Sequence, residues 1–121
     1  MRENILKEES FRFAVRVVNL YKHICAEKKE FVLSKQILRS GTSVGAMIRE
    51  AEHAESKTDF VHKMAIAQKE INETIYWLEL LGETGYISTN EFESLNADAV
   101  EIIKMLTSSL KTAKQKLTIN H

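Results

Sequence analysis

Residues 34–51, SKQILRSGTSVGAMIREA, decide the fold of this chain. Apolar residues recur through the stretch at helical spacing, yet its middle consists of small and polar residues. A second set of residues, which we call the polar stripe, follows the same spacing on another face and consists of Gln36, Arg39, Ser43, Met47 and Glu50. The stretch therefore predicts a helix with one core face and one ordered polar face.

The two faces of this helix have different expected roles. The core face consists of Leu33, Ile37, Val44, Ile48 and Ala51. The polar stripe lies about 110° around the helix from it. Arg39 and Glu50 are separated by about 16 Å along the helix axis, so they cannot pair with each other. We therefore expect both to find partners on a neighbouring helix or subunit; the alternative is a solvated face.

Two glycines, Gly41 and Gly45, thin the middle of the same helix. Each costs about 1 kcal/mol relative to alanine in a helix interior, so a compensating contact is expected. Close packing of another helix, within the bundle or across a subunit boundary, is the favoured interpretation. A local kink is the alternative.

The rest of the chain also consists of helical segments. Its 121 residues fit one domain, and the complete absence of proline favours long helices. Apolar periodicity predicts helices at about 10–28, 32–54, 58–81 and 89–117. Because the connections are short, we expect an all-α, antiparallel, up-down-up-down four-helix bundle that forms a single domain over residues 1–121.

The first predicted helix carries two apolar stripes side by side. One consists of Phe11, Ala14, Val15, Val18, Tyr21 and Cys25, and the other of Phe13, Val17, Leu20 and Ile24. This wide apolar arc predicts burial on more than one side. The third helix carries one seam with near-heptad spacing, from Phe60 to Leu81, and the fourth carries one from Phe92 to Leu117.

Local signals indicate the helix ends. Ser88 with Glu91 forms a candidate capping box, and Ser56 with Asp59 forms a variant of it. The two glycines of the segment GETGYIS, residues 82–88, are suited to ending the third helix.

Large apolar residues also lie beside the seam of the third helix, at Tyr76, Trp77 and Leu80. A wide bundle core and a contact with another subunit explain this flank equally well. The sequence leaves both interpretations open.

Charge gives no global indication of a nucleic-acid or membrane partner. Seventeen Lys and Arg balance seventeen Asp and Glu. Solvated helix faces are the simplest interpretation of the basic clusters, and phosphate contact is the alternative. For that alternative, the candidate nucleic-acid contacts are Arg12, Arg16, Lys35, Arg39 and Arg49.

No residue set identifies a reaction, so we expect no catalytic residue, metal site or cofactor. Glu50-x-x-His53 has the spacing of di-iron ligands, but His53 points nearly opposite the core face of its helix. Cys25 lies two residues from His23 on a helix, where the two side chains diverge. We therefore interpret the first pair as solvated charge and Cys25 as a buried structural thiol.

The expected location is the cytoplasm, without a membrane span. The single cysteine cannot form an internal disulfide, and the polar first ten residues contain no apolar signal region. No apolar run approaches the roughly 18 residues that a membrane-spanning helix needs.

The chain resembles the four-helix-bundle proteins encoded in intervening sequences of bacterial 23S ribosomal RNA genes, most strongly over residues 34–86. The family pattern is Gln-x-x-Arg-(small)-x-x-Ser-(apolar)-x-x-Asn-(apolar)-x-Glu, followed by Phe, Ala and Glu. Its matches here are Gln36, Arg39, Ser43, Glu50, Phe60, Ala67 and Glu73. Met47 departs from the pattern, because it stands where the family usually has asparagine.

The resemblance implies an antiparallel four-helix bundle that assembles into a homopentameric ring and has no known enzymatic activity. It also implies kinship with the accessory variability determinant of diversity-generating retroelements, a basic pentamer thought to assist a reverse transcriptase and to bind nucleic acid. This chain lacks the strong positive charge of that relative, which argues against direct nucleic-acid binding.

Three hypotheses about function remain open. The leading one is a non-enzymatic, self-assembling scaffold or adaptor. The second is an accessory protein that binds RNA or DNA. The third is a metal-dependent enzyme that uses Glu50 and His53.

Overall fold

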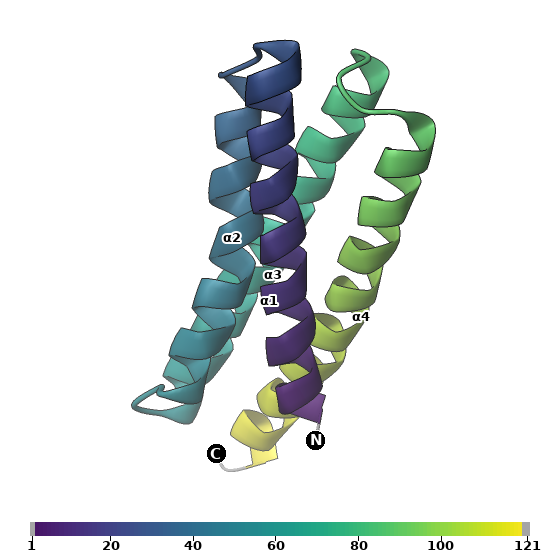
Figure 1. Cartoon of the computed structure of the whole chain (residues 1–121). Helices are drawn as coiled ribbons and strands as arrows, with labels where there is room; N and C mark the ends of the chain where they lie inside the picture. Colours follow the sequence, from purple (N-terminus) through teal and green to yellow (C-terminus); the bar gives the residue numbers. More distant parts are fainter. Residues whose placement is uncertain (1, 120–121) are drawn as a thin grey trace.

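Four long helices form the described part of the chain, which is residues 2–119 of the computed structural model, with side chains from 5 to 118. The helices are α1 (Arg2–His23), α2 (Leu33–Glu52), α3 (Lys57–Glu83) and α4 (Thr89–Ile119), and one π-helical turn, η1 (Ile24–Lys28), continues α1. They run up, down, up and down (Figure 1), and α4 also packs against α1. The predicted all-α fold of four helices is confirmed.

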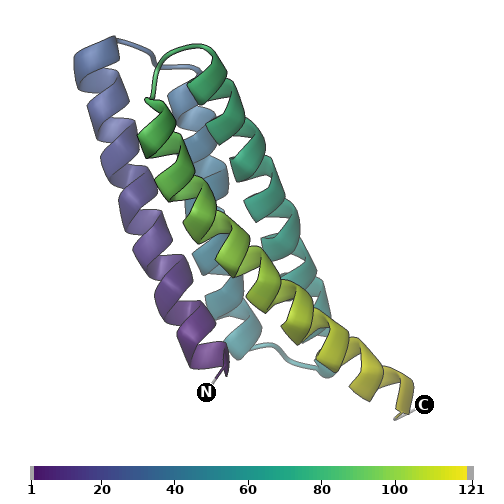
Figure 2. The same ribbon diagram turned by 90° about the vertical axis from the view of Figure 1, so that its right-hand side faces the viewer.

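The longest helix, α4, crosses the bundle obliquely. It has 31 residues, whereas α2 has 20. Figure 2 shows its C-terminal end projecting past the other helices. Within residues 2–119, no helix combines the length and the apolar character needed to cross a membrane.

The first helix begins at Arg2, eight residues before the predicted start near Ser10. The segment from residue 2 to 9 looks polar, but its strong helix formers favour a helix. Leu6 within it is fully buried. Ser10 is also buried, and its hydroxyl donates to the carbonyl oxygen of Lys7 at 3.1 Å. The predicted boundary was wrong because one buried leucine anchors an otherwise polar segment.

Only one of the two apolar stripes of α1 lies in the core. Phe13, Val17 and Ile24 are buried, whereas Phe11 and Val15 remain 55% and 44% exposed. The expectation that α1 is buried on more than one side was therefore wrong. The helix packs mainly against α2 and α4, and two neighbours on the same side cover only one of its faces.

The core follows the predicted seams of the other three helices. On α2 the buried apolar residues are Ile37, Val44, Ile48 and Ala51. On α3 and α4 they are Met64, Ala67, Ile71, Leu78, Leu81, Leu95, Ala99, Ile102, Leu106 and Leu110. Residues at the ends of the seams, such as Phe60, Phe92 and Leu117, are half-buried. The core nevertheless runs along the whole bundle, and buried residues such as Leu6 and Leu81 extend it toward the two ends.

Side-chain hydrogen bonds cap the N-termini of α4 and α3 at the residues predicted from the sequence. The Ser88 N–H donates to the Glu91 carboxylate at 2.9 Å, and the Glu91 N–H donates to the Ser88 hydroxyl at 3.1 Å. This reciprocal pair is a capping box. The Ser56 hydroxyl accepts from the N–H of Asp59 at 3.0 Å, but the Asp59 carboxylate accepts from the N–H of Glu55 instead of that of Ser56.

The third helix ends at a glycine with a left-handed backbone. Gly85 has φ of 82°, a conformation that side chains disfavour. The next N–H, that of Tyr86, donates to the carbonyl oxygen of Leu81 at 2.9 Å. This closure agrees with the end that the glycines of residues 82–88 predict.

The start of α2 depends on Glu30, a residue whose role the apolar periodicity does not predict. Its carboxylate accepts the backbone N–H groups of Val32, Leu33 and Ser34 at 3.0, 2.9 and 2.8 Å. Burial acts to raise the pKa of Glu30, but these N–H groups outweigh it and hold the pKa below its ordinary value. Glu30 thus satisfies donors that a helix start otherwise leaves unpaired.

We expect Glu30→Ala to lower the free energy of unfolding by about 1–2 kcal/mol, because three N–H groups at the start of α2 lose their acceptor. Glu27→Ala is the matched control, since Glu27 is exposed on the preceding turn. Its effect should stay below about 0.5 kcal/mol. Urea unfolding measures both, and equal losses would show that Glu30 is not a structural cap.

Candidate functional site

The polar stripe of α2 lies along the contact between α2 and α3. Arg39 donates from Nη1 to the carboxylate of Glu70 at 3.2 Å and from Nη2 to that of Glu73. At the other end of the stripe, Lys63 donates to the carboxylate of Glu50 at 2.9 Å. Both charged residues of the stripe therefore pair with a neighbouring helix of the same chain.

The other three members of the stripe make weaker contacts. The Ser43 hydroxyl donates to the carbonyl oxygen of Arg39 at 2.6 Å, within the same helix. Met47 is half-buried and packs against the core, while Gln36 is exposed. Met47 thus adds apolar contact at the position where an asparagine would present a polar amide.

Trp77 joins the cluster around Arg39. Its indole N–H donates to the Glu73 carboxylate at 3.0 Å. This hydrogen bond is the main reason that the pKa of Glu73 is lowered; burial opposes the shift, and Arg39 adds to it. The hydrogen bond with Glu73 also raises the pKa of Arg39. Because Arg39 is 53% exposed, solvent screens its two ion pairs, so they orient the helices more than they stabilise them.

The apolar flank of α3 divides between core and solvent. Trp77 packs against the core, whereas Tyr76 is 56% exposed. The two rings meet edge to face, with centroids 5.0 Å apart and planes at 72°. A wide core therefore accounts for Trp77 and leaves Tyr76 on the surface.

The two glycines of α2 bring its backbone against α1. A Cβ atom at Gly41 would lie 2.8 Å from Cγ2 of Val17, closer than two carbon atoms approach without strain. A Cβ atom at Gly45 would lie 3.4 Å from the carbonyl oxygen of Ser10. The close approach at these glycines thus occurs inside the subunit, and Gly41 is the tighter position.

The five candidate nucleic-acid contacts do not converge on one surface. Arg16 donates from Nη1 to an aspartate of α4 at 2.6 Å, and Arg39 binds two glutamates of α3. Lys35 is exposed near the start of α2. Arg12 and Arg49 alone of the five line a common site.

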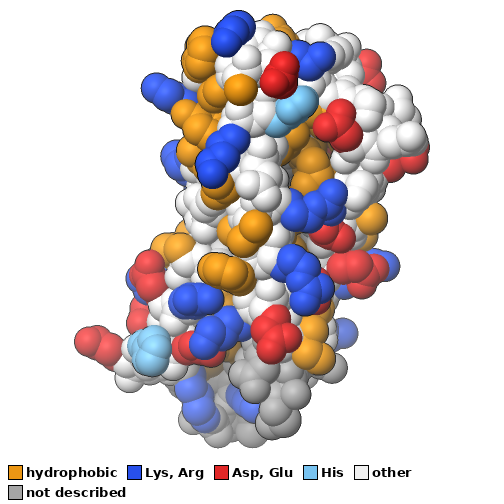
Figure 3. Space-filling view, viewed as in Figure 1, with side chains coloured by type: hydrophobic (Ala, Val, Ile, Leu, Met, Phe, Trp, Pro, Cys, Tyr) orange, Lys and Arg blue, Asp and Glu red, His pale blue; other side chains and the backbone are white. Residues whose placement is uncertain are grey.

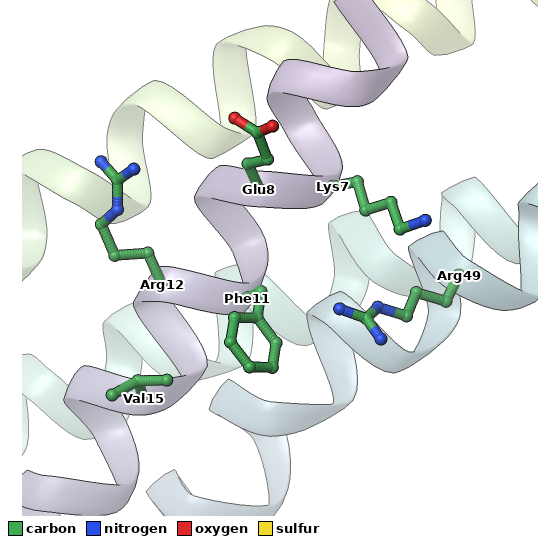
Figure 4. A pocket seen from close by; sticks show the side chains of 6 residues that line it. All are labelled: Lys7, Glu8, Phe11, Arg12, Val15 and Arg49. Carbon is green, nitrogen blue, oxygen red and sulfur yellow. The ribbon is translucent and has the colours of Figure 1, made fainter.

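That site is a hollow of about 580 Å³ between α1 and α2 (Figure 4), which we call the basic hollow. Its lining consists of Lys7, Glu8, Phe11, Arg12, Val15 and Arg49. The Arg49 guanidinium lies 5.1 Å from the centre of the exposed Phe11 ring, which is a cation–π contact. In Figure 4, Phe11 and Arg49 point toward each other, while Arg12 and Glu8 project from the outer side of α1.

The basic hollow was not predicted from the sequence, because Phe11 and Val15 fit the spacing of a buried stripe. The neighbouring charges give no signal either, because Glu9 and Arg16 lie at the same helical spacing from the buried Phe13 as Lys7 and Glu8 do from Phe11.

The residues considered for catalysis make structural contacts. Glu50 pairs with Lys63, and no three His, Cys, Asp or Glu of the described residues gather where they could hold a metal ion. Cys25 is half-buried, with its sulfur 3.7 Å from the hydroxyl oxygen of Ser34. A hydrogen bond with this thiol also raises the pKa of Tyr21.

Four antiparallel helices, with a Gln-x-x-Arg stripe on the second that faces the third, define a class of small helical-bundle proteins. The chain belongs to the 23S rRNA-intervening sequence protein family, whose family model matches residues 2–108. The resemblance to this family that the sequence motifs indicated is thereby confirmed.

A solved structure supports the same assignment. The chain is similar to a protein of unknown function from the S23 ribosomal protein family of Bacteroides thetaiotaomicron VPI-5482, with 59% sequence identity and a TM-score of 0.91. The match covers 92% of this chain and 99% of that chain. No curated protein matches the chain.

We expect Arg39→Glu to lower the free energy of unfolding by about 1–2 kcal/mol, because a third carboxylate then faces Glu70 and Glu73. Lys35→Glu makes the same charge change on an exposed position of the same helix and should cost less than about 0.5 kcal/mol. Urea unfolding followed by the fluorescence of Trp77 measures both variants. Equal, small losses of unfolding free energy in the two variants would show that the polar stripe is only a solvated face.

We expect Gly41→Ala to be destabilising by about 1–3 kcal/mol, since the added methyl group meets a stiff valine. Gly82→Ala is the control, because a Cβ atom there would lie 3.7 Å from the nearest atom of Phe92. That substitution should be neutral or stabilise by up to about 1 kcal/mol. Thermal unfolding distinguishes the two; a neutral Gly41→Ala would mean that α1 and α2 are free to separate.

Proposed function

We propose that this protein is a non-enzymatic, self-assembling helical bundle that serves as a scaffold or adaptor in the cytoplasm. The observation that carries the proposal is the exposure of Phe11 and Val15 beside the basic hollow. Figure 3 shows apolar side chains between Lys and Arg side chains on this face of the molecule. An apolar patch with a charged rim is typical of a protein–protein contact.

The polar stripe and the glycines of α2, which also suggest assembly, have partners inside the subunit. Arg39 and Glu50 pair with α3, and Gly41 packs against α1. These contacts stabilise a single copy, so the apolar surface of α1 is the better supported site of self-assembly.

A closed ring is the form of assembly that we propose, and the homopentamer implied by the family resemblance is its specific form. Copies that meet through two different surfaces keep adding until the last one closes on the first. Membership of the family is the support for this ring.

The non-enzymatic part of the proposal rests on how the reactive side chains are used. The candidate metal ligand Glu50 forms an ion pair with Lys63, and His53 is exposed at the end of α2. Cys25 lies beside a hydroxyl that does not activate a thiol. We therefore assign these groups no catalytic role.

Nucleic-acid binding is the alternative function. Its support is the resemblance to the accessory variability determinant, together with the pair Arg12 and Arg49 at the basic hollow. Arg16 and Arg39 are occupied by carboxylates, and the chain has no net charge. Because little positive charge is available to attract phosphate groups, self-assembly is the better supported function.

We expect light scattering to give the wild-type protein the mass of several chains at micromolar concentration, and Phe11→Ser/Val15→Ser to dissociate it. Loss of two buried apolar contacts should raise the dissociation constant roughly 100-fold. Ile5→Ser is the control, because Ile5 is also exposed on α1 but does not line the basic hollow. A wild-type mass equal to one chain would end the proposal.

A further inference from the structure

Charge is unevenly divided between the two halves of the bundle. Residues 2–52, which contain α1 and α2, carry ten Lys and Arg against seven Asp and Glu. Residues 53–119, which contain α3 and α4, carry seven against ten. The neutral chain therefore consists of a half with a net charge of +3 and a half with a net charge of −3. Two copies can bring unlike halves together, which favours association through different faces.

The positive half presents the basic hollow. Arg49 lies over the exposed Phe11 ring, Lys7 and Arg12 also line the hollow, and Glu8 is the one acidic residue of the lining. Two of these cations already have acidic partners: Lys7 pairs with a glutamate of α2 at 3.2 Å, and Arg12, whose side chain is 68% exposed, pairs with one of α1 at 3.2 Å. Arg49 lies over the aromatic ring, with guanidinium N–H groups that are suited to a carboxylate.

The negative half presents acidic residues on α3, where Glu79 and Glu83 line a hollow together with Thr89 and Phe92 of α4. Tyr76, Glu79, Leu80 and Glu83 follow one another at helical spacing, and we call them the acidic ridge. Tyr76 is exposed, and the edge-to-face contact with Trp77 holds its ring in place. The ion pairs of the described residues use other carboxylates, so Glu79 and Glu83 are available to an incoming cation.

We infer that the basic hollow of one copy receives the acidic ridge of a second copy. The inference rests on the proposed self-assembly and names its two faces. Tyr76 and Leu80 supply apolar surface for Phe11 and Val15. The two ridge carboxylates supply charge for Arg12 and Arg49.

Because the two faces differ, each copy uses both of them at once. Such a head-to-tail contact continues from copy to copy and ends only when the assembly closes. Ion pairs at the rim of the contact are screened by salt, so the assembly should weaken as ionic strength rises.

Charge reversal of each face tests the contact in the full chain. Arg12→Glu/Arg49→Glu reverses the hollow, and Glu79→Arg/Glu83→Arg reverses the ridge. Sedimentation velocity should show that either variant raises the dissociation constant of the assembly by roughly 100-fold, because like charges then face each other. Circular dichroism confirms that each variant keeps its helices, so that loss of assembly is not loss of fold.

Mixing the two variants provides the decisive measurement. In the mixture, each contact between unlike variants joins unlike charges, so assembly should recover although neither variant assembles alone. A ring of five must keep one contact between like variants, so the recovered assembly should be open or contain an even number of alternating copies. The matched control is Glu93→Arg/Glu101→Arg, which makes the same charge change on exposed residues of α4. This control should assemble like the wild type and should not rescue the hollow variant.

The outcomes separate this inference from the self-assembly on which it rests. A wild-type monomer would overturn both. A wild-type oligomer that survives both reversals would overturn the two faces and leave self-assembly intact. If the hollow reversal instead abolished only a salt-sensitive shift of a single-stranded RNA probe, the hollow would be a nucleic-acid site.

Discussion

The thin middle of α2 is the constraint on which the rest of the bundle depends. Gly41 lets Val17 of α1 reach the backbone of α2. The preceding residue, Ser40, is fully buried against α3, where its hydroxyl oxygen lies 2.9 Å from that of Thr74. Sliding α3 by one turn would leave the Ser40 hydroxyl without this partner in a dry core, at a cost of about 1–3 kcal/mol, whereas the Thr74 hydroxyl would keep its bond to the carbonyl oxygen of Glu70. Gly41 thus sets the distance between α2 and α1, and Ser40 sets the register between α2 and α3.

That register also separates stability from recognition in this molecule. It places the glutamates of α3 opposite Arg39, so the charged residues of the polar stripe find partners within one copy. Phe11 and Val15 on α1 and Tyr76 on α3 are among the large apolar residues that remain exposed. These exposed apolar residues are therefore the candidates for recognition, whereas the family motif contributes to the contact between α2 and α3 within one copy.

Much of the fold could be predicted from the sequence, because one apolar period and the lack of proline allow few alternatives to a helical bundle. The sequence could not show which of the two apolar stripes of α1 is buried. Phe11 and Phe13 belong to stripes of the same spacing, and only the position of the neighbouring helices decides which stripe lies in the core. The partners of Arg39 could not be identified from the sequence either, because they lie 31 and 34 residues away along the chain and depend on the register of α3. Glu30 was missed because its carboxylate caps α2 from outside the usual capping position.

The unequal lengths of the helices have a consequence for local unfolding. At 31 residues, α4 is about 46 Å long, whereas the 20 residues of α2 span about 30 Å. The buried residues of α4 extend from Leu95 to Leu110, and the turns beyond them have little to pack against. Their amide protons are protected only by the hydrogen bonds of the helix itself. The chain therefore contains a gradient of opening free energy along one helix, from values near that of global unfolding at Leu106 to values near zero after Leu117.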